Sequence, residues 1–567
     1  MRNCKVKLHL SFVMLVLISF LGTSCSSKLT PLSDNLFSAT PSPMEVVGTK
    51  VPVTVNGKFP EKWFNKNAVV VVTPVIKYQG KEVSGTSQTY QGENVAGNGI
   101  VISQKNGGNF SIKSVFDYVP EMQKSELYLR FQAGIKDKTF NLPDVKIADG
   151  MNSTVALASA LSTTPAQAPD KFQRIMKEAH EADIMFLIQQ AELRKSELTS
   201  SNLAAWKDLV KEANDNDRKY LNVEISAYAS PDGGYKLNEG LAEKREKNTS
   251  NYLNKEFEKQ EIDTEVNAKY TAQDWEGFKK LVEASNLQDK ELVLRVLSMY
   301  TDPETREREI KNISIVYKDL AETILPRLRR SRLIANVEII GKTDEELLNA
   351  VNSNSFNGLT VEELLYAATL NNSPKEAIYS YITQKYPNDY RGWNNLGSYY
   401  FANNQVSKAQ EAFNKAVQVS SKAAEPNMNL ALISLADGNV SKAQELLGNA
   451  SGANSLNEAL GLLYLKSGEY SKAVEAFGEA KTDNAALAQL LTKNYSKAQN
   501  TLENVTNKTA TTSYLAAIVS ARTNNLGGVV GNLKEAIQKD SSIKYNAVNN
   551  LEFAKFLTNP DVANMLK

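Results

Sequence analysis

The pattern of hydrophobic and polar positions divides the chain into three regions, of which the first is β-like. From about residue 45 to 150, apolar residues alternate with polar ones or gather in short β-branched runs such as VPVTVNGKF and NAVVVVTPVIKYQG. Gly, Asn and Pro separate the runs, which is typical of strands joined by turns. Several short strands within about a hundred residues predict an all-β, sandwich-like domain over residues 45–155.

In the second region, strand-like and helix-like segments alternate. YLNVEISAYAS alternates apolar and polar residues as a strand does, and PDGGYKLNEGLAEKREKNTSNYLNKEF turns on Pro and Gly into a long amphipathic helix. RRSRLIANVEIIG forms the closing strand of this region. The order β-α-β-α-β predicts an α+β domain over residues 170–345.

The third region repeats one short phrase. VSKA stands at 406–409 and 440–443, and YSKA stands at 470–473 and 495–498, so the intervals are 34, 30 and 25 residues. A period of 34 is that of a helix-turn-helix repeat. In the best copy the apolar and small positions are filled by Trp393, Leu396, Gly397 and Tyr400 on the first helix, and by Ala409, Phe413 and Ala416 on the second.

This pattern resembles a tetratricopeptide-repeat array and predicts an α-solenoid over residues 355–567. A single repeat cannot bury its own apolar face, so the array is stable only as a stack. The resemblance implies that the inner helices line a groove for a protein or peptide partner. We expect Asn394, Asn395 and Ser398 to face that groove, since Asn can hydrogen-bond an extended backbone. The alternative is that these residues form an ordinary solvated helix face.

The α+β region carries a second resemblance. In NEGLAEKRE, residues Asn238, Leu241 and Arg245 occupy positions of an N-x-x-L-S-x-x-R-A pattern, and the closing strand carries an Arg pair at Arg330 and Arg332. The region thereby resembles the OmpA C-terminal, peptidoglycan-associated domain. That family recognises diaminopimelate through an Asp and an Arg, because the ligand presents an ammonium group and carboxylates.

The Asp of the family's site has no counterpart at the matching position of this chain. Counted back from Asn238, the family's Asp position falls on Ser230, and Asp232 lies two residues later. One hypothesis is that Asp232 and Arg245, with Ser230 and Asn238 beside them, bind peptidoglycan. The other is that Arg245 is a solvated charge on a helix face, that Asp232 caps the turn, and that the domain has only a structural role.

The N-terminus indicates export. A basic stretch, the apolar run LHLSFVMLVLISFL and the sequence GTSC follow one another, and the apolar run is short for a membrane span. This resembles a bacterial lipoprotein signal over residues 1–24 and implies lipidation of Cys25; ordinary secretion and an uncleaved anchor are the alternatives. Residues 25–44, rich in Ser, Thr and Pro, read as a flexible linker. They lack the acidic cluster of surface-exported Bacteroidetes lipoproteins, which implies an outer-membrane protein facing the periplasm.

The charge balance and the few His and Cys residues argue against several classes of function. Lys and Arg total 65 and Asp and Glu total 64, so no charge excess favours a nucleic-acid partner. Removal of the signal leaves His180 as the single histidine and Cys25 as the single cysteine. We therefore expect no enzyme, no metal site and no cofactor, although a cell-wall hydrolase is a third possibility. The sequence predicts a non-enzymatic scaffold or adaptor, and alternatively a structural component of an envelope assembly that does not bind peptidoglycan.

Overall fold

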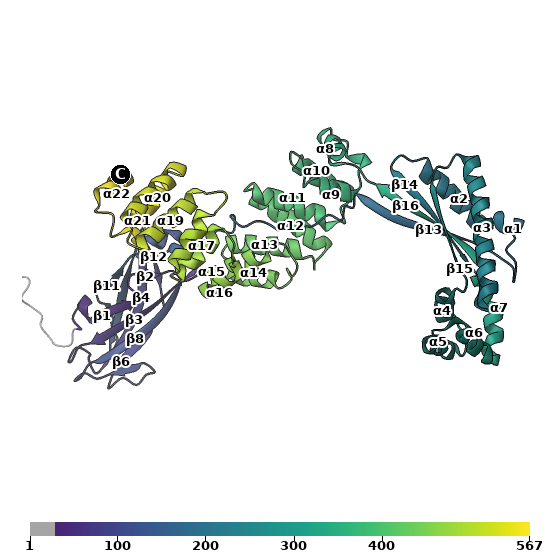
Figure 1. Cartoon of the computed structure of the whole chain (residues 1–567). Helices are drawn as coiled ribbons and strands as arrows, with labels where there is room; N and C mark the ends of the chain where they lie inside the picture. Colours follow the sequence, from purple (N-terminus) through teal and green to yellow (C-terminus); the bar gives the residue numbers. More distant parts are fainter. Residues whose placement is uncertain (1–28) are drawn as a thin grey trace, which may run out of the picture. The chain divides into compact units, whose positions relative to one another are not determined.

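The computed structural model describes residues 29–567, with residues 314–316 described by their backbone only. The signal prediction and the lipidation prediction at Cys25 lie outside the described residues. The chain divides into two compact units: the chain up to Pro169 together with Lys375–Lys567, and the intervening Asp170–Pro374 (Figure 1). Among the described residues, no helix combines the length and the hydrophobicity that a membrane-spanning segment requires.

The N-terminal part of the first unit is a β-sandwich. One sheet has the order β1-β3-β8, and the other has the order β10-β9-β4-β6-β7, with β11 added on β9 and β5 on β4. Along β8 every second residue is buried, so that Phe110, Ile112 and Phe116 enter the core between the sheets. The strands are β1 (Phe37–Thr40), β2 (Met44–Glu45), β3 (Lys50–Phe59), β4 (Ala68–Tyr78), β5 (Lys81–Ser84), β6 (Gln88–Gly92), β7 (Ile100–Ile102), β8 (Gly108–Asp117), β9 (Ser125–Ile135), β10 (Lys138–Asn141), β11 (Val145–Asp149) and β12 (Met151–Asn152).

The prediction of a flexible linker over residues 25–44 is wrong for its described part. Leu29 and Leu32 are buried in the sandwich core, and β1 pairs antiparallel with β3, with Phe37 opposite Gly57. A short 3-10 helix, η1 (Asp34–Leu36), precedes β1. Apolar residues stand at intervals among the Ser, Thr and Pro residues of this stretch. They pack into the sandwich, and strand β1 completes its three-stranded sheet.

The second unit contains one four-stranded sheet of order β13-β16-β14-β15. Strands β14 and β15 are parallel, and β16 is antiparallel to both of its neighbours. Alternate residues of the sheet, such as Ile184, Ile225 and Leu333, pack against α2 and α3. The elements are β13 (Ile175–Met185), α1 (Lys195–Leu198), α2 (Ser201–Asn214), β14 (Lys219–Tyr228), α3 (Tyr235–Gln260), β15 (Glu265–Thr271) and β16 (Arg330–Ile340).

Four helices between β15 and β16 form a small core of their own, which includes Phe278, Val293 and Leu320. They are α4 (Trp275–Glu283), α5 (Lys290–Met299), α6 (Pro303–Asn312) and α7 (Ser314–Thr323), followed by η4 (Leu325–Leu328). Helices α8 (Asp344–Asn352) and α9 (Val361–Ala367) also belong to this unit. The division between the units therefore falls at 374, later than the predicted start of the repeats at 355.

The rest of the first unit is a stack of helix pairs. Each of the four repeated phrases begins the second helix of a pair, at Val406, Val440, Tyr470 and Tyr495, and the alanine of each phrase is fully buried. The second helices shorten from 14 residues in α12 to 8 in α14, the first helices shorten from 12 residues in α15 to 9 in α17, and both changes contribute to the falling intervals. The helices are α10 (Lys375–Lys385), α11 (Tyr390–Ala402), α12 (Val406–Val419), α13 (Ala424–Ala436), α14 (Val440–Leu447), α15 (Leu456–Ser467), α16 (Tyr470–Phe477), α17 (Asp483–Leu491), α18 (Tyr495–Glu503), α19 (Ala510–Arg522), α20 (Leu526–Lys539), α21 (Ile543–Asn549), η6 (Leu551–Phe553) and α22 (Pro560–Leu566).

Candidate functional site

Asparagines on the first helices of the repeats hold a segment of the same chain, residues 158–168, which we call the connecting segment; it turns at residues 160–163 and is otherwise without regular secondary structure. At one end, Asn395 on α11 accepts a hydrogen bond from the Ala168 amide at 2.8 Å and donates to the Ala168 carbonyl at 3.0 Å. At the other end, Asn484 on α17 makes the same pair of bonds with Ser159, at 3.0 and 2.8 Å. One carboxamide therefore satisfies both main-chain groups of one residue, as a strand partner would.

Ala166, two residues before Ala168, makes the largest set of these hydrogen bonds. Asn429 on α13 accepts from the Ala166 amide at 2.7 Å and donates to its carbonyl at 2.8 Å. Asn394 and Ser398 donate to the same carbonyl, each at 3.0 Å. Asn394, Ser398 and Asn429 are fully buried, and they hydrogen-bond one another as well as the segment, so the segment completes a buried polar network.

Small side chains let the connecting segment approach the helices. Ala158, Ala160 and Ala166 are buried in the same apolar core as the repeats, and Ala168 is 3% exposed. Because an alanine projects only a methyl group, the main chain lies within hydrogen-bond reach of asparagines on the helix surface. The groove is therefore a site for an extended, uncharged segment of small residues.

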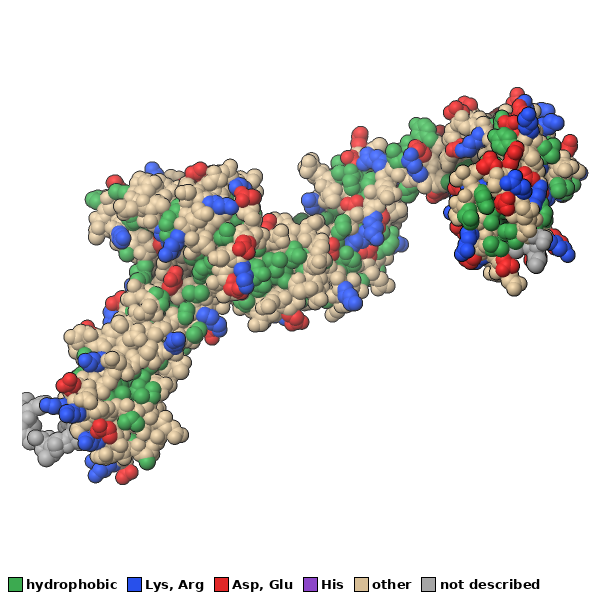
Figure 2. Space-filling view, turned by 60° about the horizontal axis from the view of Figure 1, so that its bottom comes forward, with side chains coloured by type: hydrophobic (Ala, Val, Ile, Leu, Met, Phe, Trp, Pro, Cys, Tyr) green, Lys and Arg blue, Asp and Glu red, His purple; other side chains and the backbone are tan. Residues whose placement is uncertain are grey.

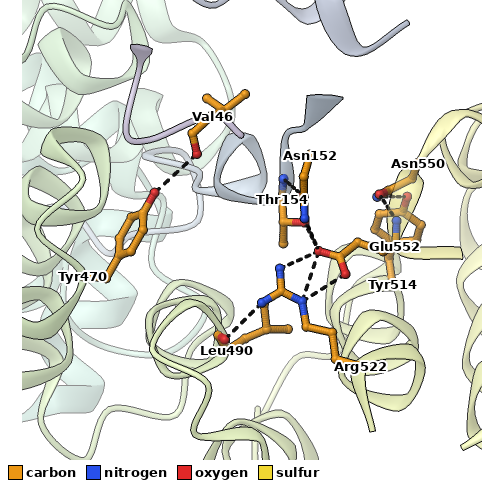
Figure 3. Close-up of polar contacts among 9 residues, drawn as sticks. All are labelled: Val46, Asn152, Thr154, Tyr470, Leu490, Tyr514, Arg522, Asn550 and Glu552. Atoms are coloured by element: carbon orange, nitrogen blue, oxygen red, sulfur yellow. Dashed lines mark hydrogen bonds and ion pairs between the residues drawn. The ribbon is translucent and has the colours of Figure 1, made fainter. Parts of the chain in front are cut away.

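A second set of contacts joins the sandwich to the last repeats (Figure 3). Glu552, 6% exposed at its side chain, accepts from Arg522 at 2.9 Å, from Asn152 at 3.1 Å and from Thr154 at 2.5 Å. Burial raises the pKa of the Glu552 carboxyl, but the hydrogen bonds and charge of Arg522 outweigh it and hold the pKa below its ordinary value. The chain is thus anchored to the repeats immediately before it enters the groove.

Asn394, Asn395 and Ser398 thus lie in the groove and bind an extended backbone, which belongs to the chain itself. Sequence reasoning did not select Asn429, Asn484 or the connecting segment. The signal for Asn429 was present, since it follows Asn395 by one period of 34 residues. The connecting segment gave no such signal, because a run of Ala, Ser, Thr and Pro is typical of any exposed linker.

Replacing Asn395 by alanine is expected to lower the free energy of unfolding of the first unit by about 1–3 kcal/mol, because the Ala168 amide and carbonyl lose their partners. Chemical denaturation of the full chain measures this change. Asn414, exposed on the outer helix α12, supplies the matched control, and its replacement by alanine should leave stability unchanged. Equal stability of the two variants would contradict the role assigned to Asn395.

Of the four residues considered for peptidoglycan binding, Ser230 and Asp232 lie in the turn before α3, and Asn238 and Arg245 lie on α3 itself. Arg245, predicted in one hypothesis to be solvated, is 1% exposed, so that hypothesis is wrong on this point. Its guanidinium donates to three main-chain carbonyls, those of Gln190 at 2.9 Å, Tyr228 at 2.8 Å and Leu187 at 3.2 Å. Burial, together with the charge of Arg329, lowers the pKa of Arg245 to about 10.

The other three residues are also engaged within the turn. Asp232 pairs with Arg329 at 3.0 Å and accepts from the Ser230 hydroxyl, while Asn238 donates to the Ser230 carbonyl at 2.9 Å. Asp232 does not cap α3, whose first turn follows Gly234. The turn is thus stabilised by the residues that the resemblance assigns to a ligand, and peptidoglycan binding by them stays a prediction.

The comparisons with known proteins support the repeats alone. A family model described as tetratricopeptide repeat matches residues 390–422, which include α11 and α12. A search of curated proteins finds no match. Tetratricopeptide repeats generally act as scaffolds that bind protein or peptide partners.

Solved structures give distant likenesses. A tetratricopeptide repeat protein from Parabacteroides merdae is 14% identical, with 37% of this chain and 91% of that one covered and a TM-score of 0.28. PilW, a type IV pilus biogenesis factor, is 13% identical over 40% and 100% of the two chains, with a TM-score of 0.26. Yeast Tom70 is 11% identical over 73% and 72%, with a TM-score of 0.25. Similarity at this level carries no conclusion about function.

Within residues 29–567, His, Cys, Asp and Glu form no cluster that could hold a metal ion. On the face seen in Figure 2, basic and acidic side chains are interspersed, and neither sign gathers into a stripe. The expectations that the protein has no cofactor and no nucleic-acid partner stay predictions.

Proposed function

We propose that the protein is a non-enzymatic scaffold of the cell envelope whose repeat array clamps the chain's own connecting segment. The observation that carries this proposal is the set of paired hydrogen bonds from Asn395, Asn429 and Asn484 to that segment. In this scaffold the array holds the sandwich and the segment leading to the α+β unit in one folded unit. Partner proteins then bind surfaces other than the groove.

The covalent attachment of the segment favours self-occupation over binding of a foreign peptide. A tethered ligand has an effective concentration of about millimolar, so a free peptide must exceed that concentration or bind much more tightly. The chain before the segment is itself fixed to the repeats, because Glu552 binds Asn152 and Thr154. The sequence predicted a partner protein or peptide in the groove. In this proposal the groove instead holds the chain's own connecting segment.

A labelled peptide with the sequence of residues 156–169 tests the filled groove. The wild-type full chain should leave this peptide unbound at micromolar concentrations, as measured by fluorescence anisotropy. A full chain with Ala166→Glu, in which the internal segment is weakened, should bind it. The same peptide with glutamate at the Ala166 position is the control and should bind neither chain. Saturable micromolar binding by the wild type would contradict the proposal.

We further propose that Cys25 carries a lipid and that the body of the protein faces the periplasm from the outer membrane. The support is the N-terminal sequence, with its basic, apolar and GTSC segments in order. A Cys25→Ala chain should lose labelling by a palmitate analogue and leave the outer-membrane fraction. Unchanged labelling would exclude lipidation at this residue.

For the α+β unit, two functions follow from the same residues. Association with peptidoglycan is supported by the resemblance, whose motif residues fall on the turn after β14, on α3 and on β16. A purely structural role is supported by Arg245, whose three guanidinium nitrogens already donate to carbonyls. We favour the structural role, because a ligand carboxylate would have to displace these internal acceptors.

Purified sacculi distinguish the two functions. Under the structural role, the full chain should sediment with sacculi no more than an unrelated protein of similar charge. If instead the wild type is retained, Asp232→Asn should abolish retention and Asp208→Asn, at an exposed position on α2, should preserve it. That second pattern would overturn the structural role and establish peptidoglycan binding. The melting temperature of each variant confirms that it is folded.

A further inference from the structure

The face of the four-stranded sheet that α2 and α3 leave open carries a basic pocket. Along β16, Leu333 and Ala335 face the helices, whereas Arg330 and Arg332 project from the opposite side. The cavity, about 570 Å³, lies at the ends of β13, β14, β15 and β16 beside α4. None of the four residues considered for peptidoglycan binding lines it, so it is a separate site.

Arg330 is the buried centre of this pocket. Its side chain is 6% exposed, and it donates to Asp274 at 2.9 Å and to the Arg327 carbonyl at 2.8 Å. The guanidinium also lies over the Tyr228 ring, 4.8 Å from its centroid. Its Nε is buried without a hydrogen-bond partner among the described residues. The nearest carboxylate, that of Asp183, lies 3.6 Å from this atom, which is within an ion pair but beyond a hydrogen bond, so the Nε donor keeps its hydrogen-bonding capacity.

Within residues 29–567, every basic residue that lines the cavity is in an ion pair except Arg327. Lys269 pairs with Glu224, Lys280 with Glu276, and Arg332 with Glu181. Asp274 is paired with Arg330, and Asp183 accepts from Arg332 at 3.2 Å. Within the part of the chain that the structure describes, the Arg327 side chain makes no ion pair and no hydrogen bond. It nevertheless lines the same cavity. The lining basic residues are Lys269, Lys280, Arg327, Arg330 and Arg332, and the lining acidic residues are Asp183, Asp274 and Glu276.

We propose that this pocket binds a small organic anion through a carboxylate or phosphate group. Guanidinium groups present planar pairs of donors that match both groups, and Arg327 has its donors available for such a bond. Arg330 and Arg332, held in place by Asp274 and Asp183, form the fixed wall of the site. Trp275 lines the cavity and reports on its occupancy.

Titration of the full chain tests the proposal. Inorganic phosphate, succinate and uncharged glucose are added at low ionic strength, with isothermal calorimetry and tryptophan fluorescence as readouts. We expect saturable 1:1 binding of at least one anion and none of glucose. Stronger binding of phosphate identifies a phosphate-bearing ligand, and stronger binding of succinate identifies a carboxylate-bearing one.

Two substitutions make the result specific to the pocket. Arg327→Gln should weaken anion binding about tenfold or more, because one charge-assisted hydrogen bond is lost. Arg308→Gln is the matched control, since Arg308 on α6 has a side chain 65% exposed and lies outside the lining, and it should bind as the wild type does. Both variants should melt at the wild-type temperature. Absence of saturable binding to either anion, or equal affinity of Arg327→Gln and the wild type, overturns the proposal.

Discussion

Replacing Ala166 by glutamate is expected to expel the connecting segment from the groove of the repeats. Ala166 is 1% exposed, and its amide and carbonyl are bound by Asn429, Asn394 and Ser398. A carboxylate at this position would be buried beside apolar side chains without a cation, which costs several kcal/mol, roughly 3 or more, and exceeds what the local hydrogen bonds contribute. The segment should therefore leave, and the fully buried asparagines should become exposed to water.

Hydrogen exchange and limited proteolysis of the full chain measure this effect. In the Ala166→Glu variant, residues 158–168 should lose protection and become a cleavage site, and the melting temperature of the first unit should fall. Gln167→Glu is the matched control, because Gln167 is adjacent but exposed. Equal protection of residues 158–168 in Ala166→Glu and in the wild type would refute the clamp.

The second large effect is expected for Arg522→Ala. The substitution leaves the Glu552 carboxylate, 6% exposed, without its cation, and such a loss typically costs about 3–5 kcal/mol. Urea denaturation of the full chain should show this loss. Lys497→Ala, which breaks the exposed pair of Lys497 with Glu479, is the control and should leave stability nearly unchanged. Similar stability of the two variants would show that the Arg522 pair does not stabilise the junction.

The same pair predicts a dependence on pH. Because the folded-state pKa of Glu552 lies below its ordinary value, ionisation of this carboxyl stabilises the folded chain above the ordinary Glu range, near pH 4.3. The stabilisation should be lost as the pH falls through the folded-state pKa. In Arg522→Ala this contribution should disappear, so the difference in unfolding free energy between wild type and variant should shrink as the solution is acidified.

Local pattern was sufficient to predict the repeats. The phrase VSKA or YSKA begins the second helix of four pairs, and its alanine is buried each time, because a helix of period 3.6 returns the same position to the neighbouring helix. The same periodicity correctly placed Asn394, Asn395 and Ser398 on the inner helices. The alternation of the β region likewise predicted the sandwich, although the strand at Phe37–Thr40 was missed.

The hydrophobic and polar pattern of a helix did not predict the burial of a side chain that a distant part of the chain covers. Arg245 lies in a helix rich in Lys and Glu, and this composition indicated a solvated face for it. In the folded unit, the segment after β13 supplies the carbonyls of Leu187 and Gln190, which enclose the guanidinium. Helical periodicity states which residues share a face, but it does not state which distant segment covers that face.

The sequence by itself therefore determined the repeat array, the start of its second helices and the presence of amides on its inner face, because these depend on residues within one or two helical turns. Only the tertiary structure decided what those amides bind. Ala168 lies 227 residues before Asn395, and Ser159 lies 325 residues before Asn484. The contacts made by backbone amides and carbonyls are the same for any residue type, so no side-chain pattern in residues 158–168 records that this segment, rather than a partner protein, occupies the groove.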